Sequence, residues 1–400
     1  MASKLQDLIN RLCPNGVEYR RLGEIATIER GNGLQKSDFK ASGIPSIHYG
    51  QLYTKLNTVA DSALTFVDEK TAANLKSLNH GDLLMAVTSE NVEDVCKCIA
   101  WLGNDGVVVG GHTAIIRHAQ NAKFLSYWFQ TQDFFAQKKK LAHGTKVIEV
   151  TPQRLTDIVI PVPPLEVQGE IVQILDNFAE LTAELTAELT AELEKRKKQY
   201  EHYRRELMAT REMCFNFSEH CMILRGEYIT KKESRPGNVP VILGGQEPAY
   251  YIDRANHTGK AIMISRSGAS AGFVSYWDEP IFATDGFIIE TDSQLEIRYL
   301  YHWLKDRQSE LNQMKKGGGV PHITGVNLAS LKPPLPPLAE QRRIVSILDR
   351  FDRLCNDLTS GLPAEIAARK KQYAYYRDKL LDFKPAPKGC GAASNRKGAA

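Results

Sequence analysis

The sequence predicts an α+β protein in which two globular mixed α/β domains are separated by two long, antiparallel, coiled-coil-like helices, related by a pseudo-two-fold internal repeat. Three observations predict this architecture. A long motif occurs twice, the residues after it have helical periodicity, and the remaining segments, 17–160 and 213–332, combine strand-like runs with glycine-rich loops. A chain of 400 residues also exceeds the usual size of one hydrophobic core, so more than one domain is expected.

The repeat consists of two blocks that keep the same offset of 173 residues, as from Pro163 to Pro336. The first block contains Pro-Pro-Leu, Gln, Ile-Val, Ile-Leu-Asp and Phe at matching positions. The second begins with Arg-Lys-Lys-Gln-Tyr, at Arg196 and again at Arg369. Because no gap separates the blocks, each repeated segment is predicted to be one rigid element.

Each repeated segment is predicted to be a helix, 165–208 and 338–382, because a Pro-Pro pair precedes it and apolar residues recur at three- and four-residue steps. Residues 165–208 would span roughly 65 Å. The second helix should kink or restart at Gly361-Leu362-Pro363. A one-sided apolar stripe needs a partner, and the other helix can supply it in an antiparallel pair. The predicted pairing and partner-docking residues are Leu181, Leu185, Leu189, Leu193, Tyr200, Leu354, Leu358, Leu362, Ile366 and Tyr373.

Residues 182–193 are three tandem copies of Thr-Ala-Glu-Leu. A leucine at every fourth position rotates around the helix by ~40° per copy. One interpretation is a plain amphipathic helix with glutamate facing water. The other is a spacer in which each copy lengthens the helix by ~6 Å.

The predicted domain boundaries follow from the repeat. Globular domains are expected at 1–160 and 213–335, the two helices at 161–212 and 336–383, and an unstructured tail at 384–400. The globular segments share strand-like runs. Asp82–Val87 corresponds to Lys260–Ile264, and Gly111–Ile116 corresponds to Asp285–Ile289. They also share a short amphipathic helix, at Lys123–Phe129 and at Arg298–Leu304.

Polar loops in both domains are candidate DNA contacts, because Arg, Lys, Asn, Gln, Ser and His can bond to phosphates and to base edges. Basic, glycine-bearing loops follow the amphipathic helix in both domains, which makes them the stronger candidates. For any single residue, an ordinary surface loop is the more common explanation. The candidates are Arg30, Asn32, Lys36, Ser89, Asn91, His112, Lys138, Lys139 and Lys146 in the first domain, and Gln246, Arg266, Ser267, Ser270, Lys315, Lys316 and His322 in the second.

The sequence predicts neither a catalytic site nor a metal site. Gln35 stands before Lys36-Ser37, where a phosphate-binding loop requires glycine, and no Asn-Pro-Pro-aromatic motif of an amino-methyltransferase occurs. The seven cysteines lack Cys-x-x-Cys spacing, so reduced thiols and a cytoplasmic location are expected. No run approaches the ~20 apolar residues of a membrane span. The formal charge of +4 is small, so any contact with nucleic acid must depend on local charge.

The duplicated pattern of a diverged domain, a Pro-Pro-Leu-x-x-Gln-x-x-Ile-Val-x-Ile-Leu-Asp segment and an Arg-Lys-Lys-Gln-Tyr helix resembles the specificity subunits of type I restriction-modification systems. The Thr-Ala-Glu-Leu copies resemble the spacer of the type IC branch. The resemblance implies that each domain is a target recognition domain for one half of a split site in double-stranded DNA. It further implies docking of two methyltransferase subunits and of restriction/translocase subunits. S-adenosylmethionine, ATP and Mg would bind to those partners and none to this chain.

Two matters stay open at the level of sequence. A coiled-coil adaptor that does not read DNA is the main alternative, and a binding affinity that falls steeply with salt would distinguish a DNA reader from it. The opening segment Gly16–Ile25 of the first domain has its nearest counterpart at Leu224–Ile229, which leaves the start of the second domain uncertain. The sequence specifies neither the bases that are read nor the spacer length.

Overall fold

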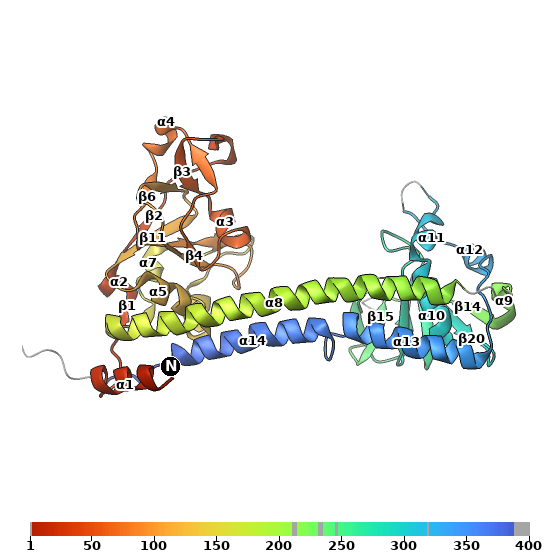
Figure 1. Ribbon diagram of the computed structural model, residues 1–400. Coiled ribbons are helices and arrows are strands. Elements are labelled where there is room, and N and C mark those ends of the chain that lie inside the picture. The colour runs from red at the N-terminus through yellow and green to blue at the C-terminus, as the bar shows by residue number, and fades with distance from the viewer. Residues whose placement is uncertain (1, 210–213, 231–234, 245–246, 318–319, 388–400) are drawn as a thin grey trace, which may run out of the picture. The chain divides into compact units, whose positions relative to one another are not determined.

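The computed structural model describes residues 2–209, 214–230, 235–244, 247–317 and 320–387. The chain forms two compact units, each described by itself below (Figure 1). Unit 1 comprises Met1–Leu185 with Ala368–Ala400, and unit 2 comprises Thr186–Ala367. The division between the units therefore falls within the two long helical segments, after Leu185 and after Ala367.

A central sheet of five strands, in the order β2-β11-β7-β9-β4, forms the core of unit 1. Its pairs are antiparallel except β4 with β9. The side chains of β7 alternate: Leu83 and Met85 face the cluster that contains α5, whereas Leu84 and Ala86 face the opposite cluster. Both faces are thus buried. The strands are β2 (Ala26–Arg30), β4 (Val59–Ala60), β7 (Leu83–Ala86), β9 (Cys98–Trp101) and β11 (Thr113–His118).

Smaller elements complete unit 1. A four-stranded sheet has the order β5-β3-β10-β6, and two further pairs are β1 with β13 and β8 with β12. These strands are β1 (Tyr19–Arg21), β3 (Ile44–Ile47), β5 (Thr65–Val67), β6 (Lys76–Leu78), β8 (Thr88–Ser89), β10 (Val107–Val109), β12 (Ile148–Glu149) and β13 (Val159–Pro161). The helices are α1 (Ala2–Leu12), α2 (Leu22–Ile25), η1 (Lys36–Asp38), α3 (Tyr49–Thr54), α4 (Glu69–Ala72), α5 (Ala122–Trp128), α6 (Gln132–Leu141) and α7 (Pro152–Leu155).

Unit 2 repeats the central sheet. Its order β14-β20-β17-β18 corresponds to β2-β11-β7-β9, and the helix α10 follows β20 as α5 follows β11. The strands and amphipathic helices expected from the sequence are confirmed. The strands are β14 (Cys221–Arg225), β15 (Val239–Ile242), β16 (Tyr250–Ile252), β17 (Lys260–Ser265), β18 (Val274–Asp278), β19 (Phe282–Ala283) and β20 (Gly286–Thr291). The helices are α9 (Phe217–His220), α10 (Ile297–Asp306), α11 (Gln308–Gln313) and α12 (Gly325–Ala329).

The start of the second domain differs from the sequence-based expectation. The short helix α9 precedes β14 as α2 precedes β2, and β14 pairs with β20 as β2 pairs with β11. The counterpart of the first domain's opening segment therefore lies before Arg225, and not at Leu224–Ile229. A four-residue helix and a five-residue strand carry too few apolar positions to be matched by pattern alone.

The first long helix, α8 (Leu165–Met208), is uninterrupted over 44 residues, as predicted. The second consists of α13 (Leu338–Asn356) and α14 (Leu362–Leu380), so the predicted restart is confirmed. In the break, the carboxylate of Asp357 accepts hydrogen bonds from the backbone amides and hydroxyls of Thr359 and Ser360. These bonds hold the pKa of Asp357 well below its usual range.

Within each unit the long helices lie side by side and antiparallel (Figure 1). In unit 1 the ring of Phe178 stacks on Tyr376, with centroids 6.0 Å apart. In unit 2 the ring of Tyr200 stacks on Phe351 at 6.1 Å.

The leucine stripe is not a uniformly buried seam, which corrects the sequence-based interpretation. Leu193 and Tyr200 are buried, but Leu181 is 61% exposed and Leu358 is 77% exposed. In unit 1 the rings of Phe178 and Tyr376 contact each other, and Leu181 and Leu185 line a hollow beside these rings rather than a closed seam. Leu185 and Leu354 are also exposed, while Leu189, Leu362, Ile366 and Tyr373 are half-buried.

Two buried glutamines explain why Gln recurs in the repeated motif. The side-chain oxygen of Gln168 accepts a hydrogen bond from the Asn121 backbone N–H at 2.9 Å, and its amide donates to the Pro163 carbonyl at 2.7 Å. Gln341 makes the same pair of bonds, with Glu296 N–H at 2.7 Å and the Pro336 carbonyl at 2.8 Å. Each glutamine thus joins the start of a long helix to the start of α5 or α10.

A repeated aspartate adds a second link about two turns further along each long helix. The carboxylate of Asp176 accepts hydrogen bonds from Lys123, at 2.8 Å, and from the Tyr127 hydroxyl, at 2.7 Å, both on α5. Asp349 accepts corresponding bonds from α10, from Arg298 at 2.6 Å and from His302 at 2.7 Å. The helices α5 and α10 are therefore each held to a long helix at two points.

Replacing Gln168 with leucine should lower the free energy of unfolding of unit 1 by about 3 kcal/mol, because a buried N–H and a buried carbonyl lose their partner. Urea unfolding monitored by circular dichroism measures the change. Gln313→Leu, at an exposed position of α11, should change stability by less than ~0.5 kcal/mol. Equal stability of the two variants would show that the amide bonds are dispensable.

Candidate nucleic-acid interface

Three strands of the central sheet in unit 1 place their loops at one edge. The register pairs Arg30 with Ala114 and Ala86 with Thr113, so the ends of β2 and β7 lie beside the start of β11. The pairing of β8 with β12 adds a fourth loop. Loop edge 1 is defined here as residues 30–36, 88–97, 110–113 and 143–149.

Unit 2 has an equivalent set of loops at the corresponding strand ends of its own central sheet. Arg225 pairs with Phe287 and Ser265 with Gly286, and an isolated bridge joins Ser267 to His322. Loop edge 2 is defined as the described parts of residues 226–230, 266–273, 284–286 and 315–323. Most sequence candidates therefore lie on equivalent edges of the two sheets, although they are far apart in sequence.

The loops that carry Lys146 and Lys316 are closed by the same pair of backbone hydrogen bonds. His143 and Glu149 exchange two backbone hydrogen bonds, at 3.0 and 2.8 Å, and Lys316 and His322 exchange two at 2.9 Å each. Gly144 and Gly317 both have positive φ, +112° and +116°. A Cβ atom on Gly144 would lie 2.0 Å from the Val147 carbonyl oxygen, so this turn requires glycine.

Several candidates on loop edge 1 have exposed side chains that can reach a ligand. These are Asn32, Lys36, Asn91, His112 and Lys146, and Lys139 is exposed on α6. Ser89 is half-buried in β8. Arg30 makes an ion pair with Glu149 at 2.8 Å and donates to the Gly111 carbonyl at 2.9 Å. Its guanidinium therefore links two of the loops.

Lys138 lies neither in a loop nor at the surface, contrary to the sequence-based expectation. The helix α6 continues to Leu141, so Lys138, Lys139 and Lys140 are all helical. Lys138 is 6% exposed, and its ammonium group donates to the carbonyls of Glu93 and Val95 at 2.7 and 2.6 Å. Helical periodicity directs Lys138 inward, because it lies one turn after the buried Phe134.

On loop edge 2, Ser270 and Lys316 are exposed, whereas His322 and Lys315 are half-buried. Lys315 donates to the Ala269 carbonyl at 3.0 Å. Asp285 pairs with Arg266 at 3.2 Å and accepts a hydrogen bond from the Ser267 hydroxyl. Gln246 lies outside the described residues.

His112 and Asp285 occupy the same backbone position in the two units. The carbonyl of His112 accepts from Val87 N–H at 2.9 Å, and that of Asp285 accepts from Arg266 N–H at 2.9 Å. The side chains differ in chemistry. His112 presents an imidazole that bonds to the Thr88 hydroxyl at 3.0 Å, whereas Asp285 presents a carboxylate. Equivalent backbones therefore offer different hydrogen-bonding groups.

A cavity of about 540 Å³ on loop edge 1 includes residues that sequence reasoning missed. Its lining includes Tyr49 and Tyr53 of α3 and Lys97, together with Asn91 and His112. The ring of Tyr49 lies between those of His48 and His112, with centroid distances of 4.5 and 4.8 Å. The Tyr53 hydroxyl donates to the Thr88 carbonyl at 2.9 Å. The only sequence signal was the four-residue spacing of the two tyrosines.

The described residues contain no cluster of three or more His, Cys, Asp or Glu that could hold a metal ion. Cys96 and Cys98 are buried, and burial raises the pKa of the Cys96 thiol to about 12. Across the described ranges, no helix has both the length and the apolar character needed to cross a membrane.

Two solved structures share this fold. One, from a study of complex assembly and conformational transition in a type I restriction-modification system, superposes with a TM-score of 0.68 at 20% identity, covering 92% of this chain and 98% of that chain. The HsdS subunit of Thermoanaerobacter tengcongensis superposes with a TM-score of 0.54 at 19% identity, covering 92% and 97%.

Sequence comparison identifies closer relatives. A Haemophilus influenzae protein designated as type I specificity subunit S.HindORF215P is 35% identical over 306 residues, which is 71% of this chain and 76% of the relative. The EcoR124I/EcoR124II specificity subunit of Escherichia coli is 33% identical over 292 residues, 65% of this chain and 70% of the relative. The family model for the type I restriction modification DNA specificity domain matches residues 14–195 and 214–368. The chain therefore belongs to the family of type I restriction modification DNA specificity domains.

Proposed function

We propose that this chain is the sequence-specific DNA-binding specificity subunit of a type I restriction-modification complex, and that it reads a bipartite site. Loop edge 1 reads one half of the site and loop edge 2 reads the other. The observation that carries this proposal is that the two edges share one backbone arrangement but differ in the side chains that they present, as His112 and Asp285 do.

This combination suits a reader of two different half-sites. A duplex offers the same phosphate geometry at any site, so a repeated scaffold can dock on it twice. Base edges in the major groove differ in their donors and acceptors, so discrimination needs different side chains at the same positions. An imidazole in one unit and a carboxylate in the other meet that requirement.

Phosphate contacts are assigned to exposed cations: Lys36 and Lys146 on loop edge 1, Lys139 on α6, and Lys316 on loop edge 2. The formal charge of +4 over the whole chain is small, so these local groups must supply the attraction.

The long helices are assigned two roles, as a spacer between the recognition domains and as a docking surface. Exposed apolar residues recur at matching positions of the two units, Leu181 with Leu354 and Tyr203 with Tyr376. A surface that occurs twice fits two copies of one partner, here two methyltransferase subunits, with restriction/translocase subunits joining through the complex. In this proposal the partner subunits carry out methylation and cleavage and bind S-adenosylmethionine, ATP and Mg. This chain is not catalytic, and the complex acts in the cytoplasm.

Neutralising Lys139, Lys146 and Lys316 together should weaken DNA binding by the assembled methyltransferase at every sequence. Each lost phosphate contact should flatten the slope of log K against log salt concentration by about 0.9. Fluorescence anisotropy of labelled DNA, measured at salt concentrations from about 50 to about 200 mM, gives the slope. Lys371→Gln, an exposed position on α14, is the control. A wild-type complex whose affinity does not depend on salt would favour the adaptor alternative.

Exchanging residues 17–160 for those of a relative with another specificity should change one half of the methylated site and leave the other unchanged. The reason is that the central sheet and loop edge 1 lie wholly within unit 1. Methylation mapping in cells that carry the hybrid and its partner subunits measures the outcome. A hybrid that alters both half-sites would contradict separate reading by the two edges.

Deleting Thr186–Leu189 removes one Thr-Ala-Glu-Leu copy and should shorten α8 by ~6 Å with a rotation of ~40°. The mutant should prefer a site whose unspecified spacer is shorter by one or two base pairs, given ~3.4 Å per pair, and both half-sites should be retained. The same methylation mapping reads the spacer length. An unchanged spacer would rule out a ruler role for this repeat.

A further inference from the structure

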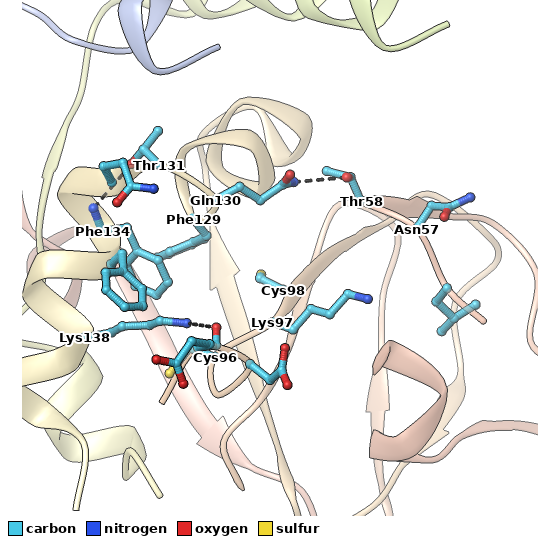
Figure 2. A pocket seen from close by; sticks show the side chains of 15 residues that line it. Asn57, Thr58, Cys96, Lys97, Cys98, Phe129, Gln130, Thr131, Phe134 and Lys138 are labelled. Atoms are coloured by element: carbon cyan, nitrogen blue, oxygen red, sulfur yellow. Dashed lines mark hydrogen bonds between the residues drawn. The ribbon is translucent and has the colours of Figure 1, made fainter. Parts of the chain in front are cut away.

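The loop at 88–97 of unit 1 separates two cavities. Ser89 and Asn91 line the cavity of about 540 Å³ on loop edge 1. On the other side, Cys96 and Lys138 line a second cavity, of about 370 Å³ (Figure 2). Asp94 and Lys97 line both cavities. The loop therefore presents candidate base-reading groups on one side and meets a buried lysine on the other.

The path of this loop leaves two carbonyl groups pointing inward. Cys96 has a φ of +67°, a left-handed conformation that is uncommon for residues other than glycine. The carbonyls of Glu93 and Val95, on either side of Asp94, both accept hydrogen bonds from the Lys138 ammonium group. Without a donor there, two carbonyl groups in a partly or fully buried position would be unsatisfied.

Lys138 is suited to this task because its charge is withdrawn from solvent. Burial lowers its pKa, while the rings of Phe134 and Phe135 flank the ammonium group at 5.9 and 5.4 Å. A buried ammonium group is tolerated only where acceptors surround it. The two short bonds to the loop supply those acceptors, so the lysine and the loop satisfy each other.

In unit 2 the corresponding loop, at 266–273, is held by Gln308, and Lys315 also donates to the Ala269 carbonyl of this loop at 3.0 Å. The loop also follows the central strand, β17, and Gln308 approaches it from α11, the helix equivalent to α6. The side chain of Gln308 donates to the Gly272 carbonyl at 2.6 Å and accepts from the Val274 N–H at 3.1 Å. Two different side chains thus hold the loop after the central strand in the two units.

We propose that Lys138 and Gln308 are positioning residues for DNA recognition, each of which fixes the base-reading loop of its own unit from behind. The inference rests on the proposed function, since it assigns these loops to the two half-sites. Neither residue touches DNA in this proposal. Lys138 sets the placement of Ser89, Asn91 and Lys97, and Gln308 sets that of Ser267 and Ser270.

The test uses the complete methyltransferase complex with Lys138→Met or Gln308→Met, which keep side-chain length and remove the bonds to the loop. The readout is the ratio of methylation kcat/KM for the mapped site to that for sites with one substituted base pair. Lys138→Met should lower this ratio about tenfold for substitutions in the half-site of unit 1 and leave the other half-site unchanged. Gln308→Met should lower the ratio about tenfold for substitutions in the half-site of unit 2 and leave the half-site of unit 1 unchanged. The salt slope should stay at the wild-type value, because no phosphate contact is lost.

Lys140→Met, on the same helix but exposed, is the matched control. It should leave both ratios and the salt slope unchanged. General destabilisation would lower the amount of active complex for every substrate, and so would change no ratio. If Lys138→Met does not assemble, Gln308→Met tests the proposal alone, because it removes no buried charge.

The proposal is overturned if both ratios are unchanged in both variants, or if both half-sites lose discrimination equally. It is also overturned if Lys138→Met flattens the salt slope, which would identify Lys138 as a phosphate ligand. Failure of the proposed function has a different signature, since the wild-type complex itself would then show no preference among DNA sequences.

Discussion

The orientation of each recognition domain on its long helix depends on one buried side-chain amide. Gln168 and Gln341 are fully buried, and each bonds both to the start of its long helix and to the start of α5 or α10. Apolar contacts alone would tolerate small rotations of one element on the other. An amide whose donor and acceptor must both be satisfied away from water permits few arrangements. The placement of the loops at both loop edges depends on these hydrogen bonds, because α5 and α10 pack on the central sheets that carry the loops.

The repeat also separates the residues that build the scaffold from those to which the proposed function assigns DNA recognition. Positions that make hydrogen bonds within the scaffold recur, as the two glutamines do, or carry another residue that bonds to the equivalent partner. Tyr127 and His302, which bond to Asp176 and Asp349, are an example. Positions whose side chains project from the loops differ in chemistry, as His112 and Asp285 do. Recognition can therefore diverge without a change in the sheet or in its attachment to the helix.

The sequence predicted the long helices and the central strands because their signals are extended and occur twice. It predicted where most polar loops lie for the same reason, since glycine and polar residues mark the ends of repeated strands. It was wrong about Lys138, because a run of three lysines suggests a basic surface, whereas the helical phase that begins with Phe134 decides which lysine is buried. It missed Tyr49, which lies on a helix of only six residues. Such contacts arise from the folding of distant segments and leave no local pattern.

The two long helices differ in whether an inserted or deleted residue must change their length. In α8 every residue from Leu165 to Met208 contributes the helical rise of ~1.5 Å, so an inserted or deleted copy of Thr-Ala-Glu-Leu must change its length by ~6 Å. The second helix is interrupted at 357–361, where Asp357 organises a turn through its bonds to Thr359 and Ser360. Residues of a turn carry no fixed rise, so a change of length can be absorbed there without breaking a helical hydrogen bond. The proposed spacer role therefore falls on α8, whose length follows directly from its number of residues, and not on the interrupted helix.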